Sequence, residues 1–147
     1  MVAALLDVNA LIALVDSDHV SHAVMSRWFR EHHHSGWATC PLTENGFIRV
    51  LSQETYPSGR RSPAEIIGAL TVLKEAFQQS YQFWPDEISL TDLSAFDPAM
   101  IAGSRQITDV YLLGLAAHHK SSLVSFDRSL SWHSIRGGSQ KMVRIPS

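Results

Sequence analysis

Several features that are typical of particular classes of protein are rare or missing in this sequence. Cys40 is the only cysteine among 147 residues, so a disulfide framework and a thiolate metal site are both excluded. Charged residues make up only 18% of the chain and the formal net charge is −2, so no general basic character points to nucleic acid.

Long hydrophobic runs are also missing. The longest apolar run, from Val110 to Ala117, is too short to cross a membrane. The first 15 residues are apolar, but they lack a basic segment and are interrupted by Asp7 and Asn9, which is not typical of a signal peptide. We therefore expect a soluble, cytoplasmic protein without a membrane partner.

What is present is the pattern of an α/β domain. A hydrophobic content of 45% supports a core, and the length fits a single domain, residues 1–147. Short apolar segments alternate with segments of helical periodicity. Strands are expected at 2–6, 37–40, 81–84, 88–90, 123–126 and 142–145, and helices at 10–15, 22–31, from 41 onward, 63–77 and 104–120. This alternation predicts a mainly parallel sheet.

Four carboxylates end or interrupt apolar segments. Asp7 and Asp127 follow expected strands, Glu44 lies in the first turns of the helix that begins at Pro41, and Asp109 lies within a strongly apolar helix. Acids are rarely buried without a partner. Because ligands of an open parallel sheet bind beyond the carboxyl ends of its strands, all four acids can reach one edge of the sheet.

Convergence of these acids would require a compensating charge. Two carboxylates about 6 Å apart repel by roughly 3 kcal/mol at an effective dielectric of about 20, so a cluster of four must be protonated or bind a cation. All-oxygen ligation selects Mg²⁺ or Mn²⁺, and such a site suits phosphodiester hydrolysis. In the alternative interpretation, Asp7 and Asp127 cap helices and Glu44 is an ordinary first-turn acid. Spacing alone leaves both interpretations open.

Four segments, in this order, resemble the motifs of PIN-domain proteins. They are residues 5–14 (LLDVNALIAL), 43–47 (TENGF), 106–112 (QITDVYL) and 123–128 (LVSFDR). Each motif alone is weak, but the ordered set is specific and spans nearly the whole chain. The length of the chain and the residues of the motifs resemble those of VapC toxins, the ribonuclease component of bacterial VapBC toxin–antitoxin pairs.

The resemblance implies a three-layer α/β/α fold and an endoribonuclease that depends on Mg²⁺ or Mn²⁺. Asp7, Glu44, Asp109 and Asp127 would form its acidic quartet, with Asp7 and Asp109 as direct metal ligands and Glu44 and Asp127 acting directly or through water. Asn9, Thr108 and Ser125 match polar positions that hold the acids in place. The resemblance also implies an RNA substrate, a homodimer, and a VapB-like antitoxin that blocks the cleft.

Other residues and other functions remain open at this stage. Arg49 and Arg128 are candidates for RNA phosphate contacts, or they are ordinary exposed arginines. His118 and His119 are expected to complement the dipole at a helix C-terminus. One alternative function is a non-catalytic PIN-type domain that binds RNA or protein. Another is an aspartate phosphotransferase, although Asn9 stands where such enzymes carry a second Asp.

Overall fold

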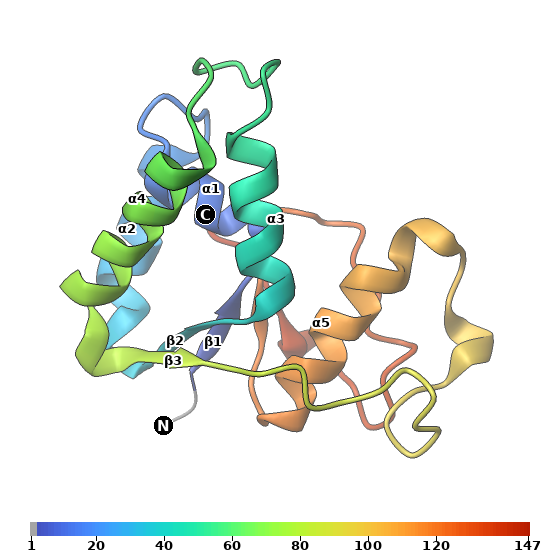
Figure 1. Ribbon diagram of the computed structural model, residues 1–147. Coiled ribbons are helices and arrows are strands. Elements are labelled where there is room, and N and C mark those ends of the chain that lie inside the picture. The colour runs from blue at the N-terminus through green and yellow to red at the C-terminus, as the bar shows by residue number, and fades with distance from the viewer. Residues whose placement is uncertain (1–2) are drawn as a thin grey trace.

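The computed structural model describes residues 3–147, so position 2 of the first expected strand lies outside it. Five strands form one sheet: β1 (Ala4–Leu6), β2 (Trp37–Thr39), β3 (Tyr81–Phe83), β4 (Leu123–Val124) and β5 (Val143–Arg144). Their spatial order is β3-β2-β1-β4-β5, and every neighbouring pair is parallel (Figure 1). The predicted parallel sheet is confirmed, and β1 is its central strand.

Helices cover both faces of this sheet (Figure 1). They are α1 (Val8–Val15), α2 (His22–His32), α3 (Pro41–Leu51), α4 (Pro63–Ala76) and α5 (Ile107–His118). Side chains alternate across β1: Ala4 and Leu6 pack into a core with the first four helices, whereas Leu5 packs into a second core with α5. The predicted α/β/α layering follows from this alternation.

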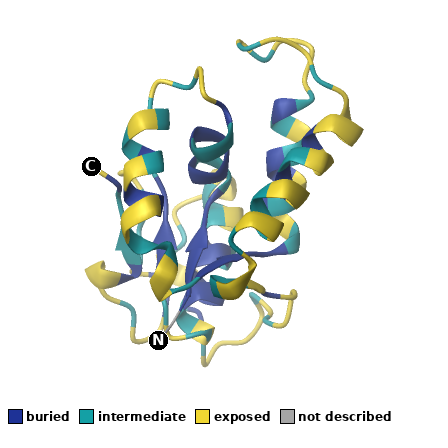
Figure 2. Cartoon of the chain, turned by 90° about the vertical axis from the view of Figure 1, so that its left-hand side faces the viewer, coloured by how far each residue is buried: buried dark blue, intermediate teal, exposed yellow. Residues whose placement is uncertain are grey.

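Coverage on both faces explains why the central strands read as uninterrupted apolar runs. Every residue of β1, β2 and β4 is buried, as the dark blue centre of Figure 2 shows. The edge strand β3 is partly exposed. No helix within residues 3–147 is both long and apolar enough to span a membrane.

The structure differs from the expected elements at several places. Residues 88–90 form no strand, because Ile88 and Leu90 pack against the second core while the chain crosses the face of α5. The helix expected over 104–120 begins as a separate 3-10 turn, Ser104–Gln106, and α5 ends at His118. Lys120 then adopts a φ of 55°, the left-handed conformation that commonly follows a helix end.

Helix starts follow local capping chemistry. Ser62 Oγ accepts the N–H of Glu65 at 3.2 Å, and Pro63 occupies the first position of α4, so this predicted start is confirmed. No helix begins at Arg128. Asp127 instead stabilises a turn, where its Oδ1 accepts the N–H and the Oγ–H of Ser129 at 2.9 and 2.6 Å.

Candidate active site

Asp7 lies at the carboxyl end of the central strand and is both a helix cap and a candidate site residue. Its backbone N–H donates to Val124 O at 2.9 Å, which fixes it against β4. Its Oδ1 accepts the N–H of Val8 at 2.8 Å and thereby caps α1, while only 7% of the residue is exposed. The capping interpretation is therefore correct for one oxygen, and the other oxygen, Oδ2, faces the end of β4.

A hydrogen-bond network joins the ends of β1 and β4 around Asp7. Ser125 Oγ donates to Asp7 Oδ2 at 2.8 Å. Asn9 Nδ2 donates to Ser125 Oγ at 3.0 Å, and Asn9 Oδ1 accepts the N–H of Phe126 at 3.0 Å. The N–H of Asp127 donates to Ser125 Oγ at 3.1 Å. These contacts fix the orientation of Asp7 and set the course of the chain that carries Asp127.

Asp109 joins this site from the first turn of α5. Burial, together with the negative charges of Asp7 and Asp127, raises the pKa of Asp109 to about 6. Burial likewise raises the pKa of Asp7; the bonds from Ser125 and Val8 oppose this rise, and the charge of Asp127 adds to it. Three carboxylates from separate segments therefore act on one another electrostatically.

A small cavity adjoins Asp109 on the side of Asp127. It has a volume of about 20 Å³ and is lined by Asp109, Gln106 and Val110 from one segment and by residues 129–131 from the other. This volume is enough for about one water molecule.

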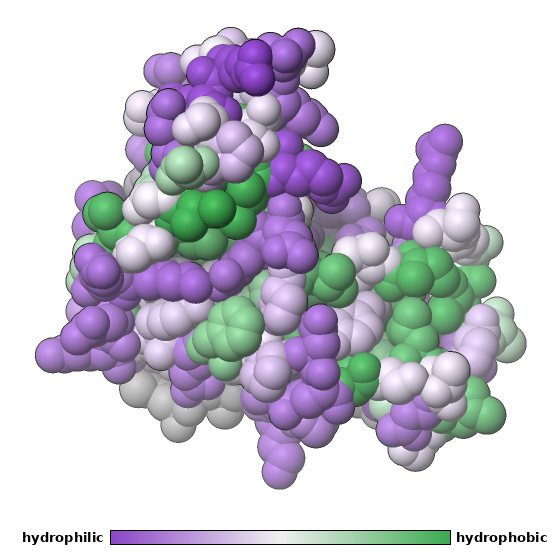
Figure 3. Space-filling model, viewed as in Figure 1, coloured by the Kyte–Doolittle hydropathy of each residue, from purple (hydrophilic) through white to green (hydrophobic). Residues whose placement is uncertain are grey.

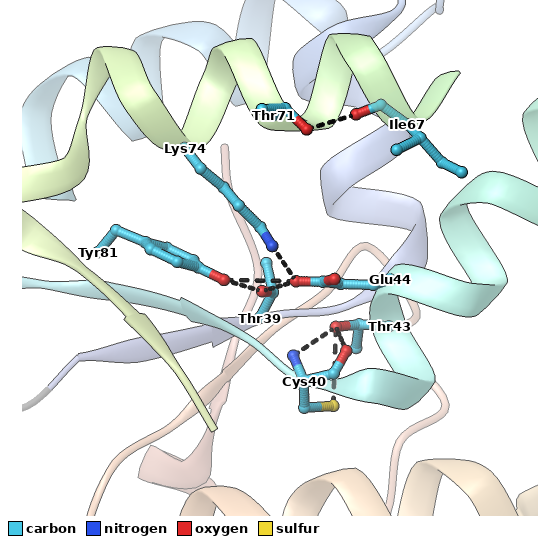
Figure 4. Close-up of polar contacts among 8 residues, drawn as sticks. All are labelled: Thr39, Cys40, Thr43, Glu44, Ile67, Thr71, Lys74 and Tyr81. Atoms are coloured by element: carbon cyan, nitrogen blue, oxygen red, sulfur yellow. Dashed lines mark hydrogen bonds and ion pairs between the residues drawn. The ribbon is translucent and has the colours of Figure 1, made fainter. Parts of the chain in front are cut away.

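Within the described residues, Glu44 makes its polar side-chain contacts with β2, α4 and β3 and not with the three aspartates. Its Oε2 accepts from Thr39 Oγ1 at 2.5 Å and from Tyr81 OH at 3.3 Å, and it lies 2.6 Å from Lys74 Nζ (Figure 4). Burial lowers the pKa of Lys74, but the contacts with Glu44 and Tyr81 outweigh it and hold that pKa above its ordinary value. Glu44 already has a cationic partner.

The helix that carries Glu44, α3, packs closely against α1. Gly46, two residues further along α3, faces Val8 at the start of α1, and a Cβ at Gly46 would lie 2.6 Å from Val8 Cγ2. A glycine at this position lets the two helices approach closely.

Sequence reasoning missed three partners of Glu44. Thr39 is the last residue of β2, so its position at the carboxyl end of a strand was a signal that could have been used. Lys74 and Tyr81 offered no such signal, because they reach Glu44 only through the packing of α4 and β3.

Three other expected residues make no side-chain hydrogen bond or ion pair with the four acids within residues 3–147. Thr108 is exposed, and its side chain makes no hydrogen bond within residues 3–147. Arg49 and Arg128 are exposed, and neither pairs with a carboxylate in the part of the chain that the structure describes.

The four carboxylates suit a hard divalent cation, although their oxygens do not all lie close together. All four groups offer carboxylate oxygens, which suit Mg²⁺ or Mn²⁺. Within residues 3–147, no three of the four acids bring ligand oxygens within 4.8 Å of one another. Asp127 is directed toward Ser129 and Glu44 toward Lys74, so these two side chains would have to turn to share a cation with Asp7 and Asp109.

The raised pKa of Asp109 predicts an unusual dependence of stability on pH. A carboxylate whose pKa is higher in the folded state binds protons more tightly there, so its ionisation destabilises the fold as pH rises from about 4 to above 6. Because Asp109 is partly exposed and solvent screens its charge, we expect its ionisation to lower the free energy of unfolding by only about 1 kcal/mol between about pH 4.5 and pH 7.5.

Urea unfolding of the metal-free protein across this pH range measures the effect. The stability of the wild-type protein relative to Asp109→Asn should fall with rising pH. Parallel pH profiles for the two proteins would show that the pKa of Asp109 is not raised in the folded protein.

Comparisons with known proteins identify the family of this chain. A model of the PIN domain matches residues 4–133. Ribonuclease VapC44 of Mycobacterium tuberculosis is 39% identical over 139 residues, covering 94% of this chain and 95% of the relative. Ribonuclease VapC39 of the same organism is 40% identical over 128 residues (87% and 91%), and Ribonuclease VapC38 is 41% identical over 124 residues (84% and 84%).

Proposed function

The chain belongs to the PIN-domain family, in its VapC branch, and on this premise we propose that it is a metal-dependent endoribonuclease, the toxin of a toxin–antitoxin pair. One observation carries the proposal beyond the resemblance. Asp7, Asp109 and Asp127 come from three separate segments, yet their charges act on one another at the carboxyl edge of a parallel sheet. A site that concentrates negative charge in this way favours a divalent cation.

Asp7 and Asp109 are the proposed direct ligands. A bound Mg²⁺ or Mn²⁺ would supply positive charge and a water of lowered pKa for attack on phosphorus. Ser125 and Asn9 hold Asp7 in one orientation. The carboxylate lone pairs of Asp7 that accept no hydrogen bond are therefore available at the edge of the sheet. Asp127, next to the same Ser125, is proposed to act directly or through water.

Glu44 is the fourth member of the proposed quartet, and Lys74 controls its position. The 2.6 Å ion pair and the Thr39 contact hold Glu44 at the margin of the site. Glu44 can reach a cation only by giving up or sharing Lys74. We therefore assign Glu44 to a water-mediated role when Lys74 remains paired.

RNA is the proposed substrate, with the exposed Arg49 and Arg128 as proposed phosphate contacts. The proposed partners are a VapB-like antitoxin that covers the acidic edge and a second copy of the chain, all in the cytoplasm. Exposed apolar side chains gather over α4 (Ile67 and Val72) and over the segment that leads into α5 (Met100 and Ile107), and Figure 3 shows green areas in both regions. These two surfaces are the proposed sites of partner contact.

Cleavage of total bacterial RNA by the purified protein tests the proposal. We expect endonucleolytic products in Mg²⁺ or Mn²⁺ and none after chelation, with mapped ends that identify the cleavage site. Production of the protein in a bacterial host should arrest growth, and co-production of an antitoxin encoded by a small neighbouring reading frame should relieve it.

The two alternatives predict other results. A non-catalytic PIN domain would bind RNA without cutting it in either metal. A phosphotransferase would trap phosphate on Asp7, but Asn9 is occupied by bonds to Ser125 and Phe126 and has no proton to exchange as an acid. Cleavage of DNA in place of RNA would overturn the choice of substrate but leave the metal chemistry intact.

A further inference from the structure

A second group of metal-ligating side chains lies at the opposite end of α5 from Asp109. Glu87 comes from the segment that follows β3, and His118 and His119 end the helix. One ligand atom from each lies within 4.8 Å of the other two, which no other group of three achieves in the described part of the chain. Nine residues of helix separate His118 from Asp109, a distance of about 14 Å along the axis, so this group is separate from the acidic site.

The interatomic distances fit a small four-coordinate ion. Glu87 Oε1 lies 2.7 Å from His119 Nε2 and 3.6 Å from His118 Nε2. Two ligands of a tetrahedral zinc ion, each about 2.1 Å from the metal, lie about 3.4 Å apart. The observed distances bracket this value, so small side-chain rotations would suffice.

His119 is held in place, and its outer nitrogen has no assigned hydrogen bond apart from its ion-pair contact with Glu87. Its ring stacks on the indole of Trp84, with centroids 3.9 Å apart and planes inclined by 7°, and Trp84 is only 2% exposed. His119 Nε2 is buried and has no well-directed hydrogen bond within residues 3–147. Glu87 Oε1 lies 2.7 Å from this nitrogen, and the two form an ion pair when the imidazole is protonated. A buried nitrogen of this kind needs a partner.

The segment that carries Glu87 is anchored to the same helix. Tyr111 OH donates to Asp86 Oδ1 at 3.1 Å, and Ile88 packs against the core that contains α5. The residues on both sides of Glu87 are therefore fixed against α5. The site joins two segments that lie far apart in the sequence.

From these contacts we propose that Glu87, His118 and His119 bind a transition-metal ion of the zinc class. Two imidazole nitrogens and one carboxylate oxygen suit Zn²⁺, whereas the all-oxygen acidic site suits Mg²⁺ or Mn²⁺. The ion would clamp residues 84–88 onto the end of α5 and leave at least one position for water. Without an ion, the same residues form an ordinary ion pair at a helix C-terminus, which is the competing explanation.

Zinc titration followed by calorimetry tests the site, with Asp109→Asn used alongside the wild-type protein to weaken the acidic centre. We expect one equivalent of Zn²⁺ to bind to both proteins. His118→Ala and Glu87→Gln should each weaken this binding by about tenfold or more. His34→Ala is the matched control, since it removes a histidine from the separate run at positions 32–34 and should leave the binding unchanged.

A second readout does not depend on cleavage. Zn²⁺ should raise the melting temperature of the wild-type and Asp109→Asn proteins but not that of His118→Ala, and Co²⁺ should give the visible absorption of a four-coordinate site only where His118 is present. Circular dichroism without metal checks that each variant is folded, and Glu87→Gln gives a readout if His118→Ala is not. Unchanged zinc affinity in both cluster variants, or loss of binding in His34→Ala alone, would overturn the proposal.

Discussion

Replacing Asp109 by Asn is expected to abolish RNA cleavage and, at the same time, to make the metal-free protein more stable. Asparagine keeps the shape of the side chain but removes a charge proposed to bind the cation, so we expect cleavage to fall by about 10³-fold or more. In the absence of metal, burial disfavours the same charge, and Asp7 and Asp127 repel it. Its removal should raise the free energy of unfolding at neutral pH by roughly 0.5–1 kcal/mol, since a favourable first-turn position offsets part of the gain.

The measurement combines a single-turnover cleavage assay in Mg²⁺ with urea unfolding after chelation. Asp92→Asn is the matched control, because Asp92 is exposed and hydrogen bonds from Ser94 lower its pKa, so its charge stabilises the fold. That variant should cleave normally and should be no more stable than the wild-type protein. Retained cleavage in both Asp109→Asn and Asp7→Asn would remove these residues from the proposed mechanism.

The expected gain in stability has a structural reason. Burial disfavours the charges of Asp7 and Asp109, and repulsion among Asp7, Asp109 and Asp127 adds to this, so both effects destabilise the folded chain without metal. A bound cation would reverse the sign of the effect, so Mg²⁺ should stabilise the wild-type protein more than Asp109→Asn. Stability and cleavage are thus expected to respond in opposite directions to the same substitution.

The sequence was sufficient to predict the parts of the site that lie at strand ends. Asp7 and Ser125 follow β1 and β4, which are neighbours in the sheet, so their contact is a direct consequence of parallel pairing. The pattern of short apolar runs between helical segments predicted the sheet for the same reason. Register and strand order then place both side chains at one edge.

Apart from the contact of Thr39 with Glu44, the contacts that were not predicted depend on packing between elements. Lys74 contacts Glu44 only because α4 packs beside α3, and no sequence pattern within either helix predicts that packing. Residues 88–90 have the composition of a strand, yet their side chains fill the core beside α5 and leave the backbone unpaired with the sheet. For the same reason, the sequence of α5 alone could not predict that Glu87 lies beside His118 and His119.

Gly114 provides a test of this packing with a large expected effect. A Cβ built at Gly114 on α5 would lie 2.2 Å from Phe96 Cζ and 2.3 Å from Cε1, and 3.3 Å from Ile88 Cδ1. Phe96 is completely buried, and its backbone bridges to Ile135, so the ring has no free space into which to move. We expect Gly114→Ala to lower the free energy of unfolding by about 3 kcal/mol, despite the higher helix propensity of alanine.

Gly68 on α4 is the matched control, because it also lies within a helix but a Cβ there would meet no atom within 4 Å. Gly68→Ala should therefore stabilise the protein by about 0.5–1 kcal/mol, the opposite sign. Urea unfolding with an unchanged m-value measures both effects. Because α5 carries Asp109 at its first turn and His118 at its last, displacement of this helix by Gly114→Ala should also weaken cleavage and zinc binding together. If Gly114→Ala proved as stable as the wild-type protein, the close contact of α5 with Phe96 would be wrong, and so would the placement of both ends of the helix.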